Sequence, residues 1–325
     1  MKKINTVLGP ISAADLGSTL IHEHFLFGFC GFQGDTTLGE FNKKASMQAC
    51  VNAAERAKAY GIHTIIDATT NECGRDPAFL KELAERTNLH IICSTGYYHE
   101  HESAFAYWKF RSSFSDIEQE IYEMFISEVT QGIGNSGICA GVIKLASSQN
   151  QITSIEQTFF RAAGRASHDL DIPIITHTQA GTMGPEQAEL LLQSGAQPYR
   201  IAIGHMCGNT DVAYHEAVLS KGVFDAFDRF GLEGELFHTP TDEERAALLA
   251  ALIHRGWENQ LLISHDSVTV ELGRPRPIPK EQLPSFAHAH IGNIGERILP
   301  MLKAHGITDT QIHKLLIENP AKLLG

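Results

Sequence analysis

Short apolar runs recur along the whole chain, and longer stretches with helical periodicity separate them. Each run is rich in Ile, Val, Leu or Ala and is bounded by glycine or polar residues, which is typical of buried parallel strands. Eight such runs lie near Thr19–His24, His63–Asp67, His90–Ser94, Ala140–Leu145, Ile172–His177, Arg200–His205, Gly222–Phe227 and Gln260–Asp266. Strands that alternate with helices in this number predict an α/β fold, a closed (β/α)8 TIM barrel.

The stretches between the runs carry the spacing and the end signals of helices. Ala45–Ala59 repeats apolar side chains at helical intervals, and Ser154–Ser167 does the same. Asp76-Pro77 indicates an N-cap followed by proline at the first helical position. A further helix is expected from Thr239-Pro240 to His254.

Two segments depart from this alternation. Ile4–Ile11 indicates a hairpin, within about residues 4–17, that turns at Gly9-Pro10. Val270–Ser285 contains Gly273 and prolines at 275, 277, 279 and 284, so we expect neither a regular helix nor a central strand there. We interpret residues 267–289 as a substrate-capping loop over the barrel mouth, with a purely structural excursion as the alternative. Because no linker divides the chain, we expect residues 1–325 to form one domain.

Composition narrows the class of partner. The chain has 43% hydrophobic and 20% charged residues and a formal net charge of −12, which argues against a nucleic-acid partner. The N-terminal residues lack an apolar signal core, and no apolar stretch is long enough to cross a bilayer. We therefore expect a cytoplasmic protein that acts on a small molecule and binds neither nucleic acid nor membrane.

Six residues with metal-binding chemistry lie where the apolar runs end. In a (β/α)8 barrel the carboxyl ends of the strands form the active site, so these residues are expected to converge. They are His22, His24, Lys144, His177, His205 and Asp266. Packing alone hardly explains six equivalent positions, although a lone His-x-His is a weak signal.

The individual residue types suggest a centre with two metal ions. His22 and His24 are two positions apart, so on a strand they face the same side. A buried Lys144 either pairs across the barrel mouth or reacts as a neutral amine with carbon dioxide to give a bridging carbamate. Imidazole and carboxylate ligands suit Zn, Fe, Co or Mn.

Two such ions, about 3.5–4 Å apart, would share a hydroxide that serves as the nucleophile. Asp266 would accept its proton as the general base. His265 should point to the opposite side of its strand, and we interpret it as structural.

These motifs resemble the phosphotriesterase family of the amidohydrolase superfamily, and most closely its phosphotriesterase-like lactonases. The resemblance runs from Ile4–Ile11 to Glu318–Pro320. It implies that one metal is held by His22, His24 and Asp266 and the other by His177 and His205. It also implies that Lys144, carbamylated to N6-carboxylysine, bridges both ions, and that the protein is a homodimer. Some family members carry Glu at the bridging position. Lys144 instead groups this chain with the phosphotriesterases and the phosphotriesterase-like lactonases.

Two residues bear on the substrate. Tyr98 resembles the mouth tyrosine of the lactonases, and its phenol would donate to a developing oxyanion. Arg229 matches the lactonase arginine after the seventh strand, where phosphotriesterases carry histidine. The alternatives are a packing aromatic and an ordinary surface arginine. One departure is Asn209, which stands where the family carries an acidic residue of a proton relay, and Asn cannot accept a proton.

We therefore expect a metal-dependent hydrolase that opens lactones, acyl-homoserine or aliphatic, and hydrolyses organophosphate triesters as a side activity. Two Zn ions are the first choice of cofactor, with Co, Mn or Fe as alternatives. The pocket walls are expected from Phe25–Phe32, Tyr97–Trp108, Arg229–His238 and the loop after Asp266. Phosphotriesterase as the main activity, hydrolysis of another ester or phosphoester, and a barrel that only binds a ligand remain alternatives.

Overall fold

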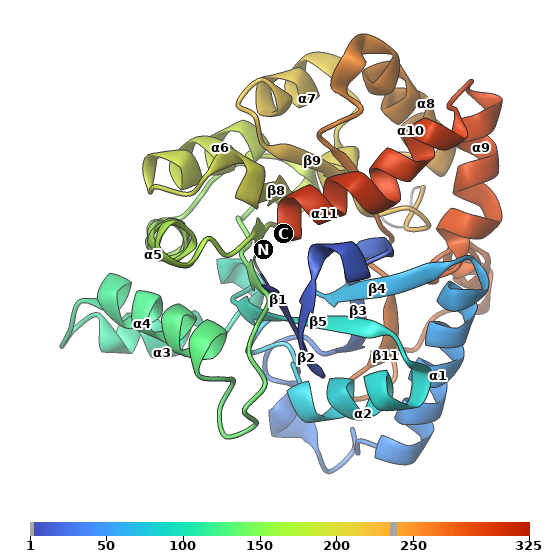
Figure 1. Cartoon of the computed structure of the whole chain (residues 1–325). Helices are drawn as coiled ribbons and strands as arrows, with labels where there is room; N and C mark the ends of the chain where they lie inside the picture. The colour runs from blue at the N-terminus through green and yellow to red at the C-terminus, as the bar shows by residue number, and fades with distance from the viewer. Residues whose placement is uncertain (1–2, 235–238) are drawn as a thin grey trace.

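The computed structural model describes residues 3–234 and 239–325. A curled parallel sheet lies at its centre, with helices around the outside (Figure 1). The sheet has nine strands in the order β10-β9-β8-β7-β6-β5-β4-β3-β11. Because β11 follows β10 in the chain and pairs with β3, these two short strands together act as the eighth strand of a barrel. The expected α/β barrel is confirmed.

Each predicted run contains a strand, although the bounds differ. The first strand is longer than expected and several later ones are shorter, because the backbone leaves the ladder before the polar residues at the mouth. The strands are β3 (Ser18–Phe27), β4 (Ile62–Asp67), β5 (His90–Gly96), β6 (Val142–Lys144), β7 (Ile174–Ile175), β8 (Ile201–Ile203), β9 (Phe224–Phe227), β10 (Leu261–Ile263) and β11 (Val268–Glu271).

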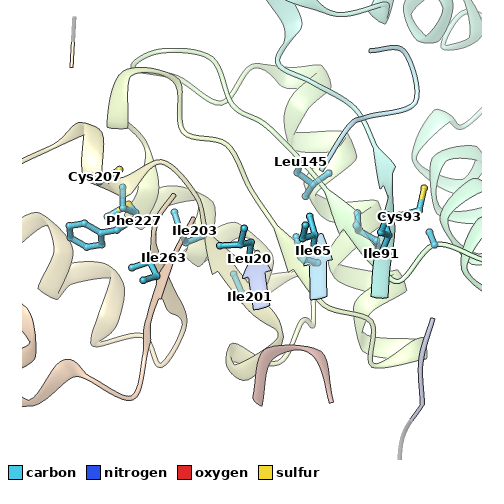
Figure 2. Close-up of a cluster of buried hydrophobic side chains, with 14 of the residues drawn as sticks. Leu20, Ile65, Ile91, Cys93, Leu145, Ile201, Ile203, Cys207, Phe227 and Ile263 are labelled. Atoms are coloured by element: carbon cyan, nitrogen blue, oxygen red, sulfur yellow. The ribbon is translucent and has the colours of Figure 1, made fainter. Parts of the chain in front are cut away.

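Side chains alternate between two apolar cores along these strands, as the pleat of a strand requires. Ile65 and Ile91 pack outward against the helices, whereas their neighbours Ile66 and Ile92 fill the barrel interior. Figure 2 shows side chains of the outer core, such as Leu20 and Ile65, side by side on strands that are far apart in the sequence. The near-continuous apolar runs therefore reflect burial on both faces of the sheet.

The helices that cover the barrel include those expected. Asp76 caps the N-terminus of its helix, with its side chain accepting from Phe79 N at 2.9 Å and Pro77 at the first position. The helices are α1 (Lys43–Ala59), α2 (Pro77–Thr87), α3 (Phe105–Arg111), α4 (Ile117–Thr130), α5 (Ser154–Leu170), α6 (Gly184–Gln193), α7 (Val212–Leu219), α8 (Asp242–Leu252), α9 (Leu299–Ala304), α10 (Asp309–His313) and α11 (Asn319–Leu324). Among the described residues, none of these helices is both long and apolar enough to cross a membrane.

Two local predictions are wrong in detail. The N-terminal hairpin pairs β1 (Lys3–Thr6) with β2 (Gly9–Ser12), so its turn lies at residues 7–8 and Gly9-Pro10 already belong to the second strand. Helix α8 begins after Thr241, whose side chain forms a capping box with Glu244, and not at Thr239-Pro240. A capping box satisfies two backbone N–H groups at once, which the earlier proline cannot do.

The proline-rich segment forms neither a regular α-helix nor a central strand, as expected. Val270 and Glu271 are paired with Leu26 and Phe27 of β3 as part of β11, so the segment begins as a strand. The prolines follow this strand, and Pro284 lies in a short 3-10 helix over Lys280–Phe286.

The two ends of the chain meet at the same end of the barrel (Figure 1). There Ile4 of the hairpin packs in one interior cluster with Leu16, Leu323 and Leu324. This end is opposite the carboxyl ends of the strands, so it closes the barrel floor and leaves the mouth for polar side chains.

Candidate metal centre

The six candidate ligands lie at the mouth of the barrel on β3, on β6 and just beyond β7, β8 and β10. His22 and His24 lie within β3, and the pairing of β3 with β4 shifts register between Leu20 and Glu23. This shift interrupts the alternation directly after Ile21, which faces the interior core. Lys144 is the last residue of β6. His177, His205 and Asp266 follow the ends of β7, β8 and β10 by two or three residues.

Two of these residues have strained backbones. His205 and Asp266 adopt left-handed φ values of 59° and 55°, a region that side chains other than Gly rarely occupy. Such a conformation costs about 1–2 kcal/mol per residue. The surrounding hydrogen bonds hold it, since Asp266 N donates to His22 O at 3.0 Å and His205 N donates to Asp228 Oδ1 at 2.6 Å. Strain of this kind is concentrated at functional sites.

All six side chains line one cavity of about 260 Å³. The nitrogen and oxygen atoms of His22, His205 and Asp266 that can bind a metal lie within 4.8 Å of one another. His24 Nε2 lies 3.1 Å from Asp266 Oδ1, and the ring of His177 packs edge-on at 4.4 Å from that of His205. The cavity thus brings together the residues that the sequence predicts, while their division between two ions stays a prediction.

Lys144 is buried, and among the described residues no carboxylate lies within ion-pair distance of its amine. Its Nζ lies 3.0 Å from His22 Nε2 and donates to Thr176 O at 3.2 Å. Burial lowers the pKa of its amine to about 8, because the ammonium loses its hydration. The alternative of a salt bridge across the mouth does not match these contacts.

Hydrogen bonds fix which ring nitrogen of His22 and His205 is free. His22 Nδ1 lies 2.7 Å from Asp228 Oδ2, and His205 Nδ1 lies 2.8 Å from Asp228 Oδ1. Since the Asp228 carboxylate accepts, both Nδ1 atoms carry the proton and both Nε2 atoms keep a lone pair. One buried carboxylate therefore prepares two imidazoles as ligands, as outer partners do in metal sites.

The other two histidines are prepared in the same way. Thr69 donates its hydroxyl proton to Leu26 O at 2.9 Å, so its oxygen accepts from His24 Nδ1 at 2.8 Å, while His24 Nε2 faces Asp266 Oδ1 at 3.1 Å. His177 Nε2 lies 2.6 Å from Gln179 Oε1, an acceptor, which leaves His177 Nδ1 as the ligand atom. Three imidazoles, those of His22, His177 and His205, thus present unprotonated nitrogens to the cavity, and His24 turns its Nε2 toward the Asp266 carboxylate.

The charge states of the site also suit metal ligands. Burial lowers the pKa of His22 to about 4, and burial lowers the pKa of His177 and His205 as well. Burial alone would raise the pKa of Asp266, but His205, His24 and His22 hold it well below its usual range. At neutral pH these imidazoles are therefore neutral and the carboxylate is ionised, which is what metal binding requires.

Tyr98 and Arg229 both reach this cavity. The Tyr98 ring packs edge-on to His177 with 4.9 Å between ring centroids, and burial raises the pKa of its phenol well above 10. Arg229 Nε lies 3.4 Å from Asp266 Oδ2. Both side chains thus reach the cavity of the candidate ligands, and their roles there stay predictions.

Sequence reasoning missed Asp228. It directly follows β9 and is fully buried, so a carboxylate at the end of an apolar run was the available signal. Asn209 does not take over an acidic role, since its Oδ1 accepts from Asp211 N at 2.8 Å. The acidic group in contact with the candidate ligands is Asp228 instead.

His265 and Glu23, which are next to candidate ligands in the sequence, make structural hydrogen bonds. His265 Nδ1 lies 2.6 Å from Glu23 Oε1, and its Nε2 accepts from Ile294 N at 2.9 Å. Glu23 also accepts from the hydroxyls of Ser264 and Ser267. The structural interpretation of His265 is consistent with these contacts, which tie the end of β10 to β3.

The expected pocket walls are partly correct. Phe27 and Phe29 line the cavity, but Phe25 belongs to the outer core and does not. From the loop after Asp266, the lining residues include Val268, Glu271, Arg276 and Phe286. The part of the expected wall from residue 235 to His238 lies outside the described residues.

A (β/α)8 barrel whose mouth gathers prepared imidazoles, a carboxylate and a buried lysine defines the class of metal-dependent barrel hydrolases. The model of the phosphotriesterase family matches residues 2–324. The chain belongs to this family, and it is a hydrolase.

Similar proteins agree with this assignment. A phosphotriesterase homology protein of Mycobacterium tuberculosis is 29% identical, with 99% of this chain and 98% of that protein covered. An aryldialkylphosphatase of Saccharolobus solfataricus is 33% identical, with 97% of both covered. The organophosphorus hydrolase from Deinococcus radiodurans superposes with a TM-score of 0.97 at 52% identity, covering 99% of this chain and 97% of that one. A mutant described as a PTE-like lactonase from the same organism gives 0.97 at 52%, with 99% and 100% covered.

Proposed function

We propose that the main activity is the opening of lactones, acyl-homoserine or aliphatic, with organophosphate triester hydrolysis as a side activity. The observation that carries the proposal is the placement of Tyr98 and Arg229. Both line the cavity of the candidate ligands, one against His177 and the other beside Asp266. Attack on a lactone carbonyl develops negative charge on one oxygen. A single phenol at the mouth can donate a hydrogen bond to that oxygen.

The residues that would hold two divalent ions are His22, His24, Lys144, His177, His205 and Asp266. Zinc is the first choice, with Co, Mn or Fe as alternatives, because mixed imidazole and carboxylate sites accept all of them. Lys144 would join as its carbamate, since its lowered pKa favours the neutral amine that reacts with carbon dioxide. When bound, such ions lower the pKa of a water and polarise the carbonyl.

Three side chains would act on the substrate and the proton. Asp266 is ionised and accepts the proton of the attacking water. Tyr98 keeps its phenolic proton because burial raises its pKa, so it donates to the carbonyl oxygen as charge develops there. Arg229, at 3.4 Å, orients the Asp266 carboxylate and adds positive charge at the mouth.

A second candidate is organophosphate triester hydrolysis as the main activity. The names of two relatives favour it, since one is called an aryldialkylphosphatase and another an organophosphorus hydrolase. The same ligand set serves attack at phosphorus, so the pocket and not the centre separates the two candidates. Other esters or phosphoesters would likewise be separated by the pocket.

The deciding experiment is kcat/KM of the zinc-loaded protein on a medium-chain lactone and on an aryl dialkyl phosphate triester. We expect a lactone preference of about a hundredfold, equal to about 2.7 kcal/mol of transition-state discrimination. A preference for the triester would support the second candidate. Turnover of neither substrate, with two ions bound by metal analysis, would reject both substrate classes.

We also propose that the protein is a homodimer. The resemblance implies it, and Tyr107, Phe110 and Phe114 in and after α3 are 57%, 64% and 73% exposed, which supplies aromatic surface for a second copy. Light scattering should give twice the chain mass of 35.7 kDa, and Phe110→Glu should shift the particle toward one chain. A wild-type particle of one chain mass would contradict the proposal.

A further inference from the structure

A fully buried arginine on α8 holds the loop that carries Arg229. Arg245 Nη1 donates to Arg229 O at 2.7 Å, and Arg245 Nη2 donates to Leu232 O at 2.8 Å. The two carbonyls bracket the turn after β9, so the planar guanidinium fixes both ends of it with a forked pair of donors. The Arg229 backbone therefore has a defined position relative to Asp266.

The partner of Arg245 connects this turn to the far end of the capping loop. Asp242, which is also fully buried, accepts from Arg245 Nη1 at 3.2 Å and from Gly231 N at 2.9 Å through Oδ1. Its Oδ2 accepts from Asn293 Nδ2 and from Arg297 Nη1, both at 3.2 Å. One buried ion pair thus binds the turn after β9 on one side and the residues that follow the capping loop on the other.

The two segments also touch directly. Gly231 has a left-handed φ of 100°, and a Cβ placed there would lie 2.1 Å from His288 O and 3.1 Å from Asn293 Nδ2. Only glycine allows this approach. The turn is therefore fixed between α8 and the capping loop with no room for another side chain.

We infer that Arg245 and Asp242 are positioning residues that set substrate discrimination by holding Arg229 and the base of the capping loop in register over the cavity. Neither residue is among those that line the cavity, so they act through the segments that they hold. The inference rests on the proposed function only where the ratio of lactone to triester kcat/KM is measured. The proposed rigidity of the turn can be measured without any substrate.

The test compares two buried arginines that both donate to main-chain carbonyls. Arg200, at the barrel floor, donates to Leu323 O at 2.7 Å and to Gly325 O at 3.1 Å, and is also buried, with 3% exposure against 0% for Arg245. Arg245→Lys and Arg200→Lys each keep the charge and lose the fork. For both variants we would measure hydrogen exchange over residues 228–234, bound zinc, the unfolding midpoint, and the ratio of lactone to triester kcat/KM.

For Arg245→Lys we expect exchange over residues 228–234 to rise about tenfold and the kcat/KM ratio to change about tenfold, with zinc content unchanged. For Arg200→Lys we expect a similar loss in the unfolding midpoint, while the other readouts stay within about twofold. The inference is overturned if Arg245→Lys leaves loop exchange or the ratio unchanged, or if Arg200→Lys changes the ratio equally. If the wild-type protein turns over neither substrate, the proposed function fails. The exchange data alone then show whether Arg245 holds the turn after β9.

A second pair of variants avoids the risk that Arg245→Lys does not fold. Gly231→Ala would push the turn away from His288 O, whereas Gly256→Ala imposes a similar strain at φ 95° with open space around its Cβ. We expect only Gly231→Ala to raise exchange over residues 228–234 and to change the kcat/KM ratio. Equal behaviour of the two glycine variants would contradict the inference.

Discussion

At the carboxyl ends of the strands the barrel buries Lys144, Asp228 and Asp266 among histidines, whereas at the opposite end Ile4, Leu323 and Leu324 fill it. At the mouth the Asp228 carboxylate lies within hydrogen-bond distance of two ligand imidazoles, those of His22 and His205. The floor places polar side chains against main-chain carbonyls, as Arg200 does with the C-terminal residues. Burial of apolar surface stabilises the fold at the floor, at about 25 cal/mol per Å².

The backbone conformation also differs between the mouth and the floor of the barrel. Ala180, Met183, His205 and Asp266 are left-handed non-glycine residues in the loops that leave the mouth ends of strands, whereas the left-handed Asn88 and Asp171 at the floor end are helix C-caps, where this conformation is common. Each such residue costs about 1–2 kcal/mol, so the mouth is held in place by the rest of the fold. Changes at the mouth should therefore affect the rate more than the stability, and changes at the floor the reverse.

The largest effect is expected for Asp266→Asn. Asparagine tolerates the left-handed backbone but cannot accept a proton, so the fold should persist while kcat/KM falls about a thousandfold, equal to about 4 kcal/mol. The measurement is steady-state kinetics of the zinc-loaded variant, with its unfolding midpoint as the control. Near wild-type turnover would contradict the role of Asp266 as the base.

A floor variant should show the opposite result. Arg200→Met leaves the carbonyls of Leu323 and Gly325 without their donor, so we expect the free energy of unfolding to fall by about 3 kcal/mol. The kcat/KM at a temperature where the variant is folded should stay unchanged. Urea unfolding gives the first quantity, and Arg86→Met, which removes an exposed pair with Glu82, is the control expected to show no measurable change.

Asp228→Asn tests whether one outer carboxylate prepares two ligands. Its loss should weaken zinc binding or activity about 10- to 100-fold, because His22 and His205 would no longer be held with Nε2 unprotonated. Asp225→Asn, within β9, is the matched control. Asp225 accepts from His215 Nδ1 at 2.6 Å, away from the cavity, so zinc affinity should not change. Equal losses in both variants would remove the special role of Asp228.

The sequence predicts the barrel and its ligands for one physical reason. In β6, Val142 and Lys144 share one strand face, and a strand that is apolar until its last residue shows where the mouth begins. Asp228 escapes such reasoning, because its contact with His22 joins residues 206 positions apart. From the sequence alone, Asp228 next to Arg229 suggests only a local salt bridge.

Local end signals explain the remaining errors. Thr239-Pro240 satisfies the helix-start pattern, but Thr241 and Glu244 form a capping box two residues later and determine where α8 begins. Arg245 reads as an ordinary polar helix position, and only the folded turn after β9 supplies the carbonyls that it binds. Sequence periodicity cannot show contacts of this kind, since they depend on where a loop closes.

The lowered pKa of Lys144 predicts how its modification depends on pH. With a pKa of about 8, the fraction of neutral amine should rise about tenfold between pH 6 and pH 7 and level off above pH 8. Carbamate formation in the metal-free protein, at constant dissolved carbon dioxide, should follow this curve. Carbon-13 NMR with labelled bicarbonate measures it, and Lys144→Met should give no signal. A curve centred near the ordinary lysine pKa would show that burial does not activate the amine.

The smallest effect is expected for Asn5→Ala at the floor. Asn5 Nδ2 donates to Val129 O at 3.1 Å and to Ala140 O at 3.0 Å, which joins the hairpin to α4 and to the residues before β6. Because water can reach this half-buried position, the loss should be about 1 kcal/mol in the free energy of unfolding, with zinc content and kcat/KM unchanged. Asn5→Asp should cost more than Asn5→Ala, since it turns a donor into a charge facing two carbonyl oxygens. An effect of either variant on kcat/KM would mean that the floor and the mouth are coupled through the strands.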